Sequence, residues 1–77
     1  SVFPNPAKNS LTIKNYSNSL NKYQLSIKNL EGQEILTRSI EFVDNFEIDI
    51  TTLSNGLYFL ILQNETEQIQ QKLIVQH

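Results

Sequence analysis

Apolar and polar residues alternate with a period of two in several separate stretches of the chain. In residues 10–14, Leu11 and Ile13 alternate with Ser10, Thr12 and Lys14. Because successive side chains of a strand point to opposite faces, this pattern predicts a strand with one buried and one wet face. The same alternation recurs at Tyr23, Leu25 and Ile27, at Phe46, Ile48 and Ile50, and at Ile69, Leu73 and Val75. No segment has a 3.6-residue apolar stripe with helix caps.

Turn residues separate these stretches. Gly32, in the segment 30–33, supplies the left-handed position of a tight turn, so residues 23–40 are predicted to form a hairpin. Asn55-Gly56 precedes the apolar run 57–62, and Gly56 accepts a positive φ that other residues resist. Residues 15–22 and 63–66 have the composition of connections. Turns spaced by about 8–12 residues predict an all-β fold, a small antiparallel sandwich of six or seven short strands.

The start of the chain contains both prolines, Pro4 and Pro6. Each ring fixes its own φ and removes a backbone donor, so this segment is stiff and is not an interior strand. We expect residues 1–9, the proline segment, to run along an edge or to cap one end of the fold. Strands then occupy residues 10–75, and residues 1–77 form a single domain.

The run 57–62 is apolar on both faces, unlike the other predicted strands. Either Leu57, Phe59 and Ile61 or the three alternate residues, Tyr58, Leu60 and Leu62, must point away from the core. A monomer rarely exposes a large apolar patch, so coverage by flanking strands or by the proline segment is the favoured interpretation. Docking of a partner on this face is the alternative.

Composition excludes several classes of function. A chain of 77 residues leaves room for one small core and hardly for a catalytic cleft. It contains no cysteine, its single histidine is the terminal His77, and its net charge is −2. We therefore expect no enzymatic activity, no cofactor, no metal and no nucleic-acid partner. Glu47 and Asp49 share one face, but without a calcium-loop spacing a solvated face is favoured over a cation site.

The order and spacing of several motifs resemble the type A C-terminal sorting domain of proteins exported by the type IX secretion system of the Bacteroidota. The resemblance extends over nearly the whole chain. The motifs are Phe3-Pro4-Asn5-Pro6, Leu11-Thr12-Ile13, Leu25-Ser26-Ile27 with Gly32-Gln33, Ile48-Asp49-Ile50 with Leu53, Asn55 and Gly56-Leu57-Tyr58, and the closing Lys72-Leu73-Ile74-Val75.

The resemblance implies an immunoglobulin-like sandwich that serves as a non-catalytic sorting signal for a larger cargo protein. The cargo passes through the periplasm, the outer-membrane translocon recognises the domain, and a surface sortase removes it, so that the cargo is secreted or stays on the cell surface. Sorting is then assigned to Lys72, Leu73, Ile74 and Val75. Structural roles fall to Pro4, Asn5, Pro6, Gly32, Asn55, Gly56 and Tyr58. Two departures from the family pattern are Phe3 in place of the more frequent tyrosine and the residues Gln76 and His77 after Val75.

Other interpretations stay open at this point. Residues 72–75 are also typical of an edge strand that fills the core and whose lysine discourages aggregation. An accessory immunoglobulin-like module that binds a glycan or a protein is the alternative function, although the chain has no tryptophan and only Tyr16, Tyr23 and Tyr58 as tyrosines. A small core without disulfides also allows a homodimer through open strand edges in isolation.

Overall fold

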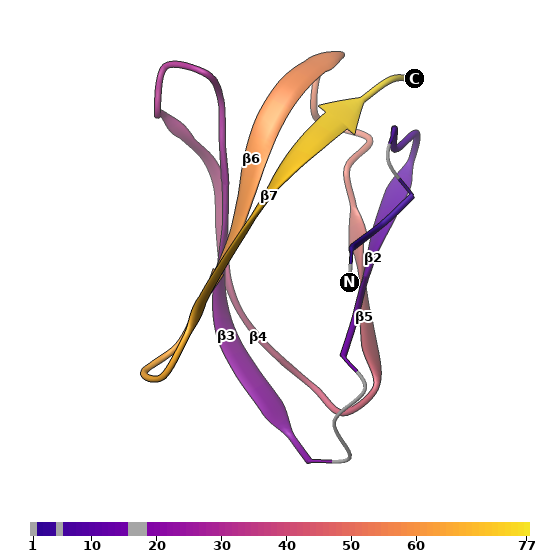
Figure 1. Cartoon of the computed structure of the whole chain (residues 1–77). Coiled ribbons are helices and arrows are strands. Elements are labelled where there is room, and N and C mark those ends of the chain that lie inside the picture. Colours follow the sequence, from indigo (N-terminus) through magenta and orange to yellow (C-terminus); the bar gives the residue numbers. More distant parts are fainter. Residues whose placement is uncertain (1, 5, 16–18) are drawn as a thin grey trace.

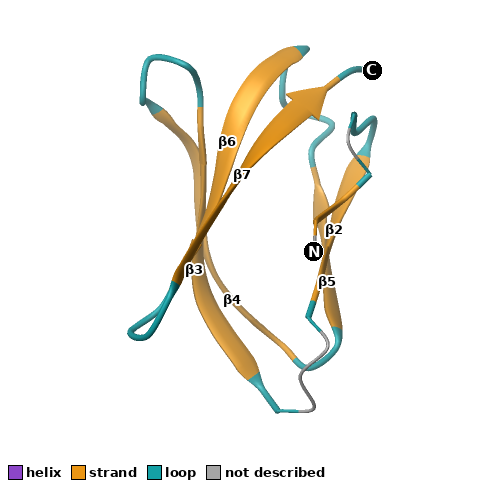
Figure 2. Cartoon of the chain, in the orientation of Figure 1, coloured by secondary structure: helices purple, strands orange, loops and turns teal. Residues whose placement is uncertain are grey.

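The computed structural model describes residues 2–4, 6–15 and 19–77, and its described part consists of strands, turns and loops without a helix (Figures 1 and 2). Within these ranges, seven strands form two sheets, and every strand ladder is antiparallel. They are β1 (Val2–Phe3), β2 (Ser10–Lys14), β3 (Asn21–Lys28), β4 (Glu34–Phe42), β5 (Asn45–Asp49), β6 (Gly56–Gln63) and β7 (Gln68–Val75). The predicted all-β, immunoglobulin-like sandwich is confirmed.

The smaller sheet has the strand order β1-β2-β5. Its central register places Leu11 opposite Ile48 and Ile13 opposite Phe46, so that these side chains point to the same face. Leu11, Ile13 and Ile48 are buried. The alternation of the sequence therefore gives this sheet one buried face, as predicted.

The larger sheet has the order β4-β3-β6-β7. Strand β3 pairs with β4 on one side and with β6 on the other, with Leu25 opposite Leu62 and Ile27 opposite Leu60. The β3–β4 hairpin has the predicted turn, in which Gly32 takes a φ of 84°. A register shift at Ile27/Lys28 puts a bulge beside this turn, which the alternation does not predict.

The two sheets enclose one apolar core, to which all seven strands and the connection after β5 contribute buried side chains. Burying apolar surface supplies about 25 cal/mol per Å², so these residues are the main source of stability. The largest side chains that are fully buried are Leu11, Leu25, Ile27, Ile48, Ile50, Leu60, Leu73 and Val75. Ile50 was expected within a strand, but β5 ends at Asp49, and the Ile50 amide instead donates to the carbonyl of Asn9 at 2.9 Å.

The proline segment lies along sheet edges, as expected. Val2 and Phe3 pair with Ile13 and Thr12 at the edge of the smaller sheet. Ala7 then forms an isolated parallel bridge to Val75 of β7, in the larger sheet. Pro4 and Pro6 are exposed. The segment therefore connects the two sheets at one side of the sandwich.

Candidate functional site

The end of β7 divides its side chains between the core and the surface. Leu73 and Val75 are each only 1% exposed and pair with Tyr58 and Gly56 of β6. Lys72 is exposed and Ile74 is 40% exposed, and both point to the outer face of the larger sheet. Of the four residues assigned to sorting, two therefore anchor the strand, and two are accessible to a partner.

The outer edge of β7 is occupied at its end. The Ala7 amide donates to the carbonyl of Ile74 at 2.8 Å, and the Gln76 amide donates to the carbonyl of Ala7, also at 2.8 Å. An edge strand leaves backbone groups open to pairing, but this part of β7 has no free edge, because the proline segment already pairs with it. The structure brings Ala7 beside Val75, so residues near opposite ends of the sequence are paired.

The turn before β6 lies next to the same end of β7. The His77 amide donates to the side-chain oxygen of Asn55 at 2.9 Å. The His77 ring nitrogen Nε2 lies 2.6 Å from the carbonyl oxygen of Leu53, which can only accept, so Nε2 carries the hydrogen. Asn55 and the adjacent Gly56, with a φ of 156°, thus hold the last residues of the chain. Sequence reasoning assigned no such contact to His77.

The remaining structural residues occupy other places. Gly32 lies in the β3–β4 turn, where the side-chain oxygen of Asn29 accepts hydrogen bonds from the amides of Glu31 and Gln33. This turn is not part of the β7 site. Asn5 and Tyr16 lie outside the described residues.

The two faces of β6 are now distinguished. Tyr58, Leu60 and Leu62 are buried in the core, and the residues that alternate with them, Leu57, Phe59 and Ile61, are half-buried on the outer face. Neighbouring side chains of the same sheet cover this face in part. Ala7 of the proline segment pairs with the outer edge of β7, so this residue does not cover the outer face of β6.

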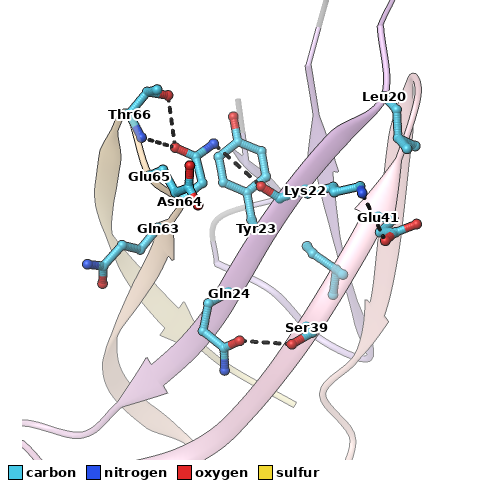
Figure 3. A pocket seen from close by; sticks show the side chains of 11 residues that line it. Leu20, Lys22, Tyr23, Gln24, Ser39, Glu41, Gln63, Asn64, Glu65 and Thr66 are labelled. Carbon is cyan, nitrogen blue, oxygen red and sulfur yellow. Dashed lines mark hydrogen bonds and ion pairs between the residues drawn. The ribbon is translucent and has the colours of Figure 1, made fainter.

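A shallow depression of about 640 Å³ lies between the β3–β4 strands and the β6–β7 turn (Figure 3). Its polar groups contact one another: Ser39 donates to Gln24 at 2.9 Å, and Lys22 lies 3.9 Å from Glu41. Asn64 accepts from both the amide and the hydroxyl of Thr66. These groups stabilise the strands and the turn, and they form no acid–base pair aimed at a substrate.

Among the described residues, Tyr23 and Asp49 have shifted pKa values, and each shift has a local structural cause. The Tyr23 hydroxyl donates to Glu67, and this bond, followed by burial, raises the pKa of Tyr23 above its ordinary value. The amide and the hydroxyl of Thr51 donate to Asp49 and lower the pKa of its carboxyl. Asp49 thus closes a turn beside Thr51.

Among the described residues, no group of three histidine, cysteine or acidic residues is placed to hold a metal ion. None of their segments is a helix long and apolar enough to cross a bilayer.

Fold and site together define a class of protein, a small immunoglobulin-like module whose first and last segments are joined along one side. Within this class, the chain belongs to the family described as the secretion system C-terminal sorting domain, whose family model matches residues 1–76. This family is the C-terminal sorting domain of type IX secretion, which confirms the resemblance seen in the sequence. No curated protein matches the chain in a sequence comparison.

Membership in this family gives the general function. The chain is a type IX secretion C-terminal sorting signal, and a domain of this kind is a tail of a cargo protein that is secreted or lies at the cell surface. The family is not known as catalytic.

Proposed function

We propose that the outer-membrane translocon recognises residues 1–77 as one unit through the end of β7, at Lys72, Leu73, Ile74 and Val75. A surface sortase then cuts at or before Ser1, after the cargo has crossed the periplasm and the outer membrane. The domain itself acts as an address and performs no chemistry.

One observation carries this proposal. Leu73 and Val75 are fixed in the core while Lys72 and Ile74, which alternate with them, are presented outward on the same rigid strand. A recognition element held by a strand loses little conformational entropy when it binds a partner. The end of β7 is also held by Ala7 and by the contacts of His77, so its geometry is fixed before any partner arrives.

The test is to fuse residues 1–77 to the C-terminus of a periplasmic reporter in a type IX-competent host. We expect the reporter in the medium or on the cell surface, and a cut close to residue 1 in the released product. A reporter that stays in the periplasm contradicts the proposed function. An exported reporter that keeps its tail contradicts only removal by the sortase.

A matched pair of variants tests the site. Lys72→Ala with Ile74→Ala removes the outward side chains at the end of β7, and Gln63→Ala with Gln68→Ala removes an exposed cross-strand pair at the other end of the β6–β7 ladder. We expect only the first pair to reduce export. Equal export of the reporter by both double variants would contradict the assignment of sorting to residues 72–75.

The accessory binding module has less support. Sugar-binding sandwiches present exposed aromatic platforms, whereas the side chains of Tyr23 and Tyr58 are buried in the core. Tyr16 lies outside the described residues. A glycan screen that gives millimolar or better affinity would favour this module over the sorting signal.

A further inference from the structure

The outer face of the larger sheet carries four neighbouring apolar side chains, which we name the apolar row: Leu57, Phe59, Ile61 and Ile74. The first three alternate along β6 and are half-buried. Ile74 of β7 lies opposite Leu57 in the register and is 40% exposed. The row is therefore continuous across two strands.

The outer face of the smaller sheet has a different character. Its cross-strand pairs are polar, with Ser10 opposite Asp49, Thr12 opposite Glu47 and Lys14 opposite Asn45. The β2–β5 part of this outer face is thus wet, whereas the outer face of the larger sheet is partly apolar. Contiguous apolar surface on a small protein marks an interaction site more often than a solvated surface does.

The charged residues directly beside the apolar row are lysines, and Glu34 of β4 lies opposite Lys28, one strand farther from the row. The register places Lys28 on one side of Phe59 and Lys72 on the other, and it places Ser26 and Gln70 beside Ile61. None of these four flanking positions is acidic, although the chain as a whole has a net charge of −2. The complement of this surface is an apolar centre bordered by carboxylates.

We propose, on the basis of the sorting function above, that this face docks a protein surface of the secretion machinery that presents apolar side chains bordered by Asp or Glu. The contact is made by side chains across the sheet face. Addition of a strand at the end of β7 is blocked, because Ala7 already pairs with Ile74 there. Lys72 borders this face, Ile74 is part of the apolar row, and both lie at the end of β7. The proposed sorting residues and the outward residues of β6 therefore lie on one surface.

Two other occupants fit this surface less well. A second copy stacked symmetrically on the same face would bring Lys28 and Lys72 close to the same lysines of its partner, and like charges repel. Surfaces that recognise anionic lipids use clusters of about four to eight basic residues, whereas two lysines flank Phe59 here. A protein with acidic side chains is therefore the occupant that the charges favour.

Single charge reversals test the proposal in the reporter fusion. Lys28→Glu and Lys72→Glu each change the net charge by two units, as does the control Lys8→Glu on an exposed bend outside the larger sheet. We expect each of the first two to reduce export about tenfold, the equivalent of about 1.4 kcal/mol of binding. We expect Lys8→Glu, and the conservative pair Lys28→Arg with Lys72→Arg, to export like the unchanged tail.

The outcomes separate this inference from the sorting function. An unchanged tail that is not exported contradicts the sorting function itself. If the unchanged tail is exported and both reversals are exported equally well, the docking face is wrong and the sorting function stands. Thermal unfolding of each variant checks that the fold is kept, and a reversal that lowers the melting temperature is replaced by Lys28→Gln or Lys72→Gln.

Two binding experiments on the reporter fusion address the other occupants. Flotation with vesicles that contain phosphatidylglycerol tests a lipid surface, and sedimentation over a range of concentrations tests a second copy. We expect the fusion not to bind the vesicles. We also expect no self-association that the two reversals abolish. Either result would overturn the assignment to an acidic protein partner.

Discussion

The Tyr58 hydroxyl donates a hydrogen bond of 2.7 Å to the carbonyl oxygen of Ser54, four residues earlier in the chain. Tyr58 lies near the start of β6, directly after the chain has crossed from the smaller sheet to the larger one. Immunoglobulin-like sandwiches use such a tyrosine to fix this crossing. The bond therefore positions β6, the strand against which β7 and the residues proposed for sorting are aligned.

Replacement of Tyr58 by phenylalanine removes this hydrogen bond and keeps the buried ring. We expect the free energy of unfolding to fall by about 1–2 kcal/mol, because a carbonyl at a partly buried site loses its donor. Urea unfolding measures the change. Ser54→Ala is the control, since it keeps the carbonyl, and it should cost less than about 0.5 kcal/mol. Equal losses in both variants would argue against this bond as the cause.

Adjacent residues of β7 should separate stability from export. Leu73→Ala leaves a cavity in the core and should cost about 2–5 kcal/mol. Ile74→Ala changes an outward side chain and should cost below about 1 kcal/mol, because part of its surface is already in water. Thermal denaturation beside the export assay checks this pair. A stable Ile74→Ala tail that is exported normally would show that this side chain plays no part in recognition.

The contact between the proline segment and β7 depends on one backbone donor. Ala7→Pro removes the amide that bonds to the Ile74 carbonyl and puts a larger ring in a buried position, so we expect a loss of at least about 1 kcal/mol. Hydrogen exchange at the Gln76 amide, which bonds to the Ala7 carbonyl, should become faster. Pro6→Ala keeps the Ala7 donor and serves as the control. Unchanged exchange at Gln76 in Ala7→Pro would mean that this bond does not hold the edge.

The bond from Tyr23 to Glu67 predicts a pH dependence at alkaline pH. The raised pKa of Tyr23 in the folded state means that folding favours the protonated phenol. Its contribution to stability is thus fully present below about pH 10, the ordinary pKa, and is lost as the pH rises through the higher folded value.

The measurement is urea unfolding of the unchanged chain and of Tyr23→Phe from about pH 8 to 11. At the lower end, the unchanged chain should be more stable by about 1 kcal/mol. The difference between the two should shrink toward the upper end, and the other titrating groups cancel in it. A difference that stays constant over the range would contradict the assigned role of Tyr23.

The turn at Gly32 gives a prediction about the backbone. Its φ of 84° is a conformation that side-chain-bearing residues rarely adopt, although no heavy atom lies within 4 Å of the position a Cβ would take. Gly32→Ala should therefore cost about 1–2 kcal/mol through strain alone, and Gly32→Asn should cost less. Thermal denaturation with Glu31→Ala as a neutral control checks it. A neutral Gly32→Ala would show that the turn relaxes.

Much of the fold could be predicted because its determinants are local. Alternation at Leu11 and Ile13 and at Phe46 and Ile48 specifies which face of each strand is buried, and Gly32 marks the hairpin turn. The division into two sheets is not local. It depends on pairs such as Leu11 with Ile48, whose partners lie far apart in the sequence, and periodicity carries no information about strand order.

The candidate site was harder to predict for the same reason. The sequence marks residues 72–75 as a strand, but their accessible edge depends on Ala7, whose small buried side chain has no distinctive pattern. The two faces of the run 57–62 are both apolar, so only the register with β3 and β7 shows which one points outward. The family comparison supplied the sorting function, which physical patterns alone did not give.

The bridge between Ala7 and Val75 joins residues near the two ends of the chain, and Leu73 and Val75 fill part of the core. A nascent polypeptide consequently cannot finish this sandwich until β7 has been synthesised. A cargo whose translation stops early would lack both the outward side chains of β7 and the support that holds them. Under the proposed recognition at the end of β7, only a chain synthesised through Val75 presents the residues that a partner would contact, so export would depend on complete synthesis of this strand.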